Sequence, residues 1–91
     1  MKNEPFEAGE IVLSKAGRDR GRAFVVTAVL DGDYVLLADG RLRTLERPKK
    51  KKRRHLLRAS TEARMELHAH LLDADIRKFL IAQGYENDRK E

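Results

Sequence analysis

The sequence predicts a mainly β protein with some α-helix: a small antiparallel β-barrel followed by a C-terminal helical tail. Three observations support this prediction. Short apolar runs in the first half are separated by turns about every eight to twelve residues. An Asp-Gly pair follows an apolar run at residues 31–32 and again at residues 39–40. Glycine at such a position accepts the positive φ of a tight hairpin turn. From Ser60 onwards, the apolar residues adopt helical spacing.

The first two expected strands flank a basic loop. Residues 11–13 form a short apolar run, and residues 23–30 are rich in β-branched, aromatic and leucine side chains, which favours strand over helix. Residues 15–22 between them hold two glycines and four bases but no large apolar side chain, which is typical of a loop.

The Asp-Gly turns lead into further strands. We expect strands over residues 34–38 and 41–45, and a last short strand over residues 55–58. Four glycines are assigned to structural turns: Gly17, Gly21, Gly32 and Gly40.

The spacing of apolar residues in the tail, residues 59–84, predicts two helical segments. Ser60 or Thr61 is placed to cap the first, and Asp73 or Asp75 the second. The apolar positions of the two segments are Met65, Ala69 and Leu72, then Leu72, Ile76, Phe79 and Leu80. Gly84 stands where a glycine ends a helix, and the polar residues 85–91 are expected to fray.

The expected strands carry more apolar side chains than a barrel interior needs. Val25, Val29, Val35 and Leu37 therefore require a cover, supplied either by the helical tail or by a second subunit. The predicted division of the chain is an N-terminal arm (1–7), the barrel (8–58, including a basic run at 47–54), the helical tail (59–84) and the frayed C-terminus (85–91).

The positive charge of the chain is concentrated in one segment. The formal net charge is +5, yet residues 41–58 hold ten bases and one acid, a net charge of +9. Each flanking segment carries five bases and seven acids, a net charge of −2. Residues 49–54 are six consecutive bases, which should be extended and solvated unless a polyanion neutralises them.

Composition disfavours several classes of protein. The chain has no cysteine, which excludes disulfides and thiolate sites and fits the cytoplasm. Its apolar runs are far shorter than the roughly 20 residues that span a membrane, and no signal peptide is expected. A chain of 91 residues builds deep catalytic clefts with difficulty, so a binding module is favoured.

The bases suit a phosphate backbone, because arginine adds bidentate geometry to its charge. Basic runs also serve in nuclear targeting, in heparin or anionic-membrane binding, or simply as a solvated surface. The candidate nucleic-acid-binding residues are Lys15, Arg18, Arg20, Arg22, Arg41, Arg43, Arg47, Lys49, Lys50, Lys51, Lys52, Arg53 and Arg54.

The residues give little support for base stacking, metal binding or catalysis. Aromatic side chains are few, so base stacking is disfavoured, and Tyr34 is better explained as a rim residue than as a stacking platform. His68 and His70 would point about 200° apart on a helix, which excludes a shared metal ion. No nucleophile or phosphate-cradling motif is present. We therefore expect no enzyme activity, metal, cofactor or small-molecule substrate.

Residues 9–26, from Gly9-Glu10-Ile11 through the basic loop to Phe24-Val25-Val26, resemble a KOW motif. The stretch that continues to Leu56 is similar to small bacterial KOW-domain RNA-binding proteins and, through them, to KOW-containing large-subunit ribosomal proteins of archaea and eukaryotes. The resemblance covers about residues 8–58. It implies an SH3-like barrel that binds RNA through residues 15–22 and the adjoining bases.

The leading hypothesis is thus a non-enzymatic RNA-binding protein. It would be cytoplasmic and ribosome-associated, contacting ribosomal RNA on or near the large subunit by phosphate and shape recognition. The alternative is a protein-interaction adaptor beside the ribosome or RNA polymerase, with the tail helix as its docking surface for ribosomal proteins or a second subunit. Duplex DNA binding and anionic-membrane binding rank lower, since no basic amphipathic helix supports a membrane role.

Overall fold

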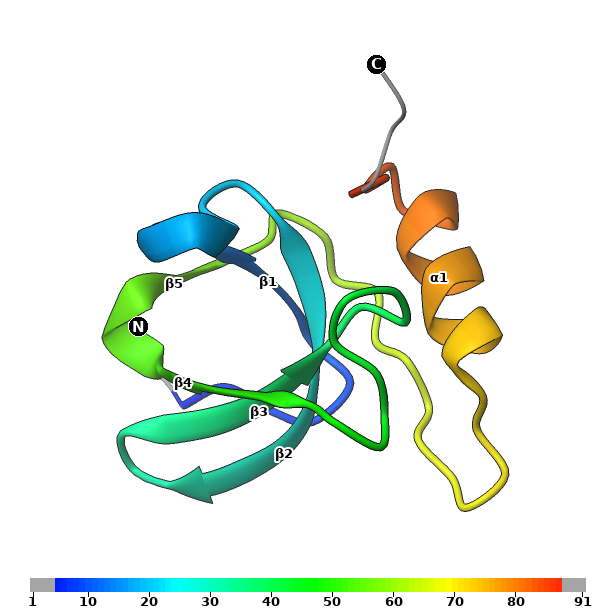
Figure 1. The fold of residues 1–91 in the computed structure, drawn as a ribbon, viewed down its shortest axis with the longest axis horizontal. Coiled ribbons are helices and arrows are strands. Elements are labelled where there is room, and N and C mark those ends of the chain that lie inside the picture. The colour runs from blue at the N-terminus through cyan, green and yellow to red at the C-terminus, as the bar shows by residue number, and fades with distance from the viewer. Residues whose placement is uncertain (1–4, 88–91) are drawn as a thin grey trace.

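A computed structural model describes residues 5–87. In this part of the chain, a five-stranded antiparallel sheet packs against one C-terminal α-helix (Figure 1), which confirms the mainly β class with some helix. The strand order is β4-β3-β2-β1-β5. The elements are β1 (Ile11–Ser14), the 3₁₀ helix η1 (Gly17–Asp19), β2 (Ala23–Asp31), β3 (Tyr34–Ala38), β4 (Lys49–Lys52), the 3₁₀ helix η2 (Arg53–His55), β5 (Leu56–Arg58) and α1 (Asp73–Ala82).

Four predicted strands are confirmed within about a residue at each end, and they form β1, β2, β3 and β5. Gly17, Gly21 and Gly40 adopt the positive φ expected of turn glycines, at 78°, 88° and 80°. Gly32 does not have a φ in this region, although it lies in the turn between β2 and β3. Its hairpin turn is therefore not the primed type that the Asp-Gly pair predicted.

The strand predicted over residues 41–45 is wrong. The side chain of Asp39 accepts hydrogen bonds from the backbone N–H groups of Arg41 and Arg43, at 2.9 and 3.0 Å, and this folds the chain into an irregular loop. The fourth strand is instead β4, which lies in the run of six bases. That run is extended as expected, but it is not merely solvated, because β4 pairs with β3 from Leu37↔Lys49 to Tyr34↔Lys52.

The sheet is strongly curved, and its two edge strands follow one another in the chain (Figure 1). The 3₁₀ helix η2 forms the corner between them. The backbone N–H of Arg53 donates to the carbonyl of Asp33 at 2.8 Å, and the N–H of Lys15 donates to the carbonyl of His55 at 2.9 Å. Among the described residues, no strand ladder joins β4 directly to β5.

Two hydrophobic cores lie against the sheet. The sheet core contains Phe6, Val12, Phe24, Val26, Val35, Leu37 and Leu56. The helix-side core contains Ile11, Ala23, Val25, Ala38 and Ala59 together with Ile76 and Leu80 of α1. The predicted cover is thus confirmed for Val25. Val35 and Leu37 are buried in the sheet core instead, and Val29 is exposed.

The tail differs from the prediction before residue 73. Residues 61–68 have no helix, and half-buried side chains alternate there with exposed ones. The backbone N–H of Met65 donates to the carbonyl of Gly9 at 2.9 Å, so this segment runs alongside the start of the sheet. Its apolar residues follow the alternation of an extended chain rather than helical spacing.

The second helical segment is confirmed as α1. At its start, the carboxylate of Asp75 accepts a hydrogen bond from the backbone N–H of Leu72 at 2.9 Å. At its end, Gly84 has a φ of 93°, and the N–H groups of Gly84 and Tyr85 donate to Ile81 and Leu80. This is the glycine-terminated helix end that the sequence predicted. No helix in the described part of the chain is long and apolar enough to cross a membrane.

The fraying predicted for residues 85–91 is wrong for residues 85–87. The Asn87 side chain accepts a hydrogen bond from the Ala23 N–H at 2.8 Å and donates one to the Ala23 carbonyl at 2.6 Å. It thereby extends the pairing of β2 in the manner of a short strand. Residues 88–91 lie outside the described part of the chain, as do residues 1–4 of the N-terminal arm.

Candidate nucleic-acid interface

The basic loop over residues 15–22 packs beside the corner formed by β4 and η2 (Figure 1). The loop contains one 3₁₀ turn, η1, in which Asp19 is buried. The ammonium group of Lys51 donates a hydrogen bond to the carbonyl of Ala16 at 3.1 Å and lies 3.9 Å from the Asp19 carboxylate. Two segments that are far apart in the sequence are thus joined into one basic surface.

The side chains of β4 alternate between two environments. Lys50 and Lys52 lie over the ring of Tyr34, with their ammonium nitrogens 4.7 and 5.9 Å from its centre. Lys51 is on the opposite face, and its side chain is only 9 % exposed. Because its ammonium group is held inside by Ala16 and Asp19, Lys51 is a structural residue rather than a phosphate ligand.

A small open pocket lies where the β2–β3 turn meets the corner at η2. It has a volume of about 180 Å³ and is lined by Asp33, Tyr34, Lys52 and Arg54. Lys52 is the register partner of Tyr34 across the β3–β4 ladder, and the hydrogen bond from Arg53 to Asp33 holds the turn against the corner. The backbone therefore fixes the positions from which these side chains line the pocket.

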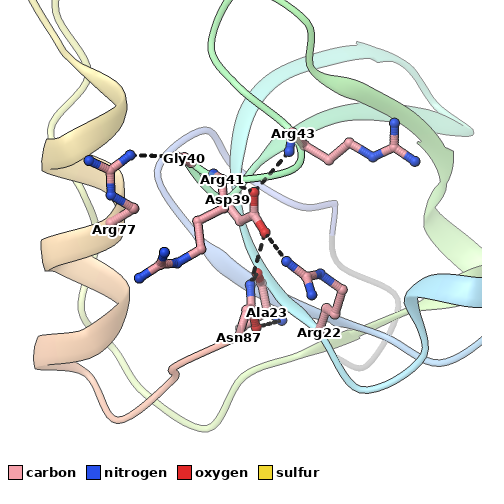
Figure 2. Close-up of polar contacts among 8 residues, drawn as sticks. All are labelled: Arg22, Ala23, Asp39, Gly40, Arg41, Arg43, Arg77 and Asn87. Carbon is pink, nitrogen blue, oxygen red and sulfur yellow. Dashed lines mark hydrogen bonds and ion pairs between the residues drawn. The ribbon is translucent and has the colours of Figure 1, made fainter. Parts of the chain in front are cut away.

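The other end of the basic loop is tied to a buried carboxylate (Figure 2). The guanidinium of Arg22 donates to Asp39 at 2.6 Å, and the amide of Asn87 donates to the same carboxylate oxygen at 3.2 Å. Burial by itself raises the pKa of Asp39, but the hydrogen bonds from the backbone of Arg41 and Arg43 and the charge of Arg22 outweigh it. The pKa of Asp39 consequently lies below its ordinary value, and the group is a stable anion at neutral pH.

Helix α1 contacts the irregular loop after β3 through Gly40 (Figure 2). The guanidinium of Arg77 donates to the Gly40 carbonyl at 2.6 Å. A β-carbon at Gly40 would lie 2.4 Å from the carbonyl oxygen of Asp73, so glycine is required for this close approach. The carboxylate of Asp73 in turn accepts a hydrogen bond from the Leu45 N–H at 2.8 Å.

Thirteen bases were predicted to contact RNA, and their exposure divides them. The exposed members are Lys15, Arg18, Arg20, Arg41, Arg47, Lys50 and Arg54. The half-buried members are Arg22, Arg43, Lys49, Lys51, Lys52 and Arg53. Arg22 and Lys51 are held in internal ion pairs, and the guanidinium of Arg53 lies 5.6 Å from the ring centre of Phe6.

A second buried carboxylate, Glu10, forms an ion pair with Arg58 that was not predicted from the sequence. Glu10 is almost fully buried just before β1, and its carboxylate is paired with Arg58 and accepts a hydrogen bond from the Glu7 N–H at 3.0 Å. Arg58 also lies 4.6 Å from the ring centre of Phe6. No local pattern marks this pair, because its partners are brought together only by the β1–β5 ladder.

No group of three or more His, Asp or Glu side chains within residues 5–87 is arranged to hold a metal ion. No family model matches the chain, and no curated protein matches it.

Proposed function

We propose that this protein is a non-enzymatic RNA-binding module of the cytoplasm that contacts ribosomal RNA on or near the large ribosomal subunit. It recognises phosphates and the shape of the RNA rather than extended base sequence. The curved sheet would then be an SH3-like barrel of the KOW type, in agreement with the resemblance of residues 8–58.

The observation that carries the proposal is the junction of the basic loop with the β4–η2 corner. Lys15 is bonded to His55 through the backbone, and Lys51 links β4 to Ala16. These contacts hold the loop, with its exposed Lys15, Arg18 and Arg20, against the corner that carries the exposed Arg54. Lys50 lies on the opposite face of β4, over Tyr34. A dense group of cations on a fixed scaffold suits a phosphate backbone, which supplies most of the affinity of nucleic-acid binding.

Titration of the protein against a structured RNA at several salt concentrations tests the proposal. If about six phosphates are neutralised, the logarithm of the binding constant falls with the logarithm of salt with a slope of about −4 for single-stranded contacts. Affinity that does not change with salt, or no binding near physiological ionic strength, would refute the proposal.

The ribosomal assignment has its own test. Sedimentation of ribosomes should show the protein with the large subunit at low salt and its release in a high-salt wash. Migration away from the large subunit at low salt would contradict this part of the proposal.

The adaptor hypothesis required the apolar face of the tail helix as a docking surface. Ile76 and Leu80 of α1 are buried in the helix-side core against Val25 and its neighbours. This use of the helix favours a covering role for it over docking to another protein.

A further inference from the structure

We infer that the pocket beside Tyr34 binds one unpaired nucleotide of the RNA, and that it prefers guanine. This inference rests on the proposed RNA-binding function and adds to it a site for a single base. The pocket volume of about 180 Å³ is below the roughly 300–1,000 Å³ of sites for drug-sized ligands. It therefore suits one planar ring with its phosphate outside.

The charges around the pocket match a nucleotide better than a simple anion. Lys52 and Arg54 supply positive charge at the wall, whereas Asp33 supplies a carboxylate. A site for inorganic phosphate alone gains nothing from an acid in its lining. A nucleotide has an anionic phosphate that can bind Lys52 and Arg54, and its base has N–H groups that can donate to Asp33.

Tyr34 provides the aromatic face. It begins β3 and is half-buried, so its ring is held by the sheet. The ammonium groups of Lys50 and Lys52 now lie over the ring, an attraction that is modest at a hydrated surface. An incoming base can replace these flexible side chains on the ring, and the displaced ammonium groups are then free to meet the phosphates on either side.

Asp33 accounts for the preference among bases. An ionised carboxylate only accepts hydrogen bonds, and guanine presents two adjacent N–H donors on its pairing edge. Asp33 lines the pocket next to Tyr34, so a guanine ring stacked on Tyr34 can direct these donors to it. Unpaired bases are the ones whose pairing edges are open to such contacts.

The test compares three RNA hairpins of the same stem: one fully paired, one with a bulged guanine and one with a bulged uridine. Wild-type protein should bind the guanine-bulged hairpin most tightly. Tyr34→Leu should lose about tenfold in affinity for the guanine-bulged hairpin and stay within about twofold on the fully paired one. Tyr34→Phe, which keeps the ring, should behave as wild type on all three. Asp33→Asn should reduce the preference for bulged guanine over bulged uridine.

The other outcomes overturn the inference in distinguishable ways. If Tyr34→Leu binds the guanine-bulged hairpin as tightly as wild type, or weakens binding to this hairpin and the fully paired one equally, the pocket does not hold a base. If wild-type protein binds none of the hairpins, the RNA-binding proposal itself fails and this inference fails with it. Free GMP carries the same ring and phosphate, so it is added as a competitor. Displacement of the RNA by micromolar GMP would assign the pocket to free nucleotides instead.

Discussion

Asp39 connects the basic loop, the irregular segment after β3 and the tail. Asp39→Asn removes the anion that Arg22 and the backbone groups of Arg41 and Arg43 bind. Because the amide nitrogen that replaces one carboxylate oxygen cannot accept a hydrogen bond from Arg22, we expect the free energy of unfolding to fall by about 2–4 kcal/mol. Urea unfolding measures this. Glu46→Gln, at an exposed acid, is the control and should change stability by less than about 0.5 kcal/mol.

The depressed pKa of Asp39 predicts how this contribution depends on pH. A carboxyl group whose folded-state pKa lies below its ordinary value of 3.8 stabilises the protein fully above that value. The contribution is lost as the pH falls through the folded-state pKa. The stability difference between wild type and Asp39→Asn should therefore be constant from pH 7 down to about 5 and shrink below 3.8. A difference that grows on acidification would contradict this assignment.

Two glycines with positive φ offer a matched comparison. A β-carbon at Gly40 would collide with the backbone of Asp73, whereas nothing lies within 4 Å of one at Gly21. Gly21→Ala should cost only the left-handed strain, about 1–2 kcal/mol. Gly40→Ala adds displacement of α1 and should cost at least about 2 kcal/mol more. Equal melting temperatures for the two variants would show that α1 does not pack tightly on Gly40.

At the residue scale, the turn predicted at Asp39 and Gly40 is present, but it is a loop closed by the Asp39 side chain rather than a hairpin. An Asp-Gly pair between apolar runs is compatible with a hairpin and also with an aspartate that binds the backbone two and four residues on. The second arrangement is favoured by Arg22 and Asn87, which are distant in sequence and donate hydrogen bonds to the same carboxylate. Local pattern contains no information about such partners.

At the scale of the element, β4 predicts different effects for adjacent lysines. Lys51→Met leaves Asp19 without its ammonium partner and should lower the free energy of unfolding by about 1–3 kcal/mol. Lys50→Met removes an exposed charge; it should leave stability within about 0.5 kcal/mol and weaken RNA binding at low salt. Urea unfolding and RNA titration of both variants separate the roles. Equal losses of RNA affinity without loss of stability would show that both lysines contact phosphate.

The elements that could be predicted were those whose own residues show an apolar or β-branched pattern. β2 and β3 are rich in β-branched and apolar side chains, and both were predicted with nearly correct ends. The strand β4 consists of four lysines and has no apolar alternation, so only its pairing with β3 makes it a strand. The first tail helix failed for the opposite reason. Residues 61–68 contain apolar positions that fit both a helical and an alternating pattern, and packing against Gly9 selected the extended form.

At the scale of the whole molecule, the helix stabilises the fold by covering the sheet. Ile76→Ala creates a cavity in the helix-side core and should cost about 2–5 kcal/mol. Ile81→Ala on the same helix changes an exposed side chain and should cost about 1 kcal/mol or less. Thermal unfolding followed by circular dichroism compares the two. A melting temperature for Ile76→Ala equal to that of Ile81→Ala would mean that the helix is not part of the cooperative fold.

The candidate site was predictable as a list of bases but not as a surface. Charge counting identified residues 41–58, and the glycines and bases between the first two expected strands identified the loop over residues 15–22. Neither observation revealed that Lys51 is paired with Asp19 and Arg22 with Asp39 inside the protein. The place of Tyr34 beside Lys50 and Lys52 depends on the register of β3 and β4, which the sequence analysis did not contain.

The contact between Asn87 and Ala23 has a consequence for the order of folding. These residues are 64 positions apart, whereas the β2–β3 hairpin closes between Asp31 and Tyr34. Because distant contacts must repay the entropy of closing a long loop, we expect the hairpin to form early and the tail to dock late. Until the tail docks, the apolar residues of the helix-side core face water, and a chain in that state is prone to self-association. We therefore expect faster docking of residues 73–87 to raise the yield of soluble protein during refolding.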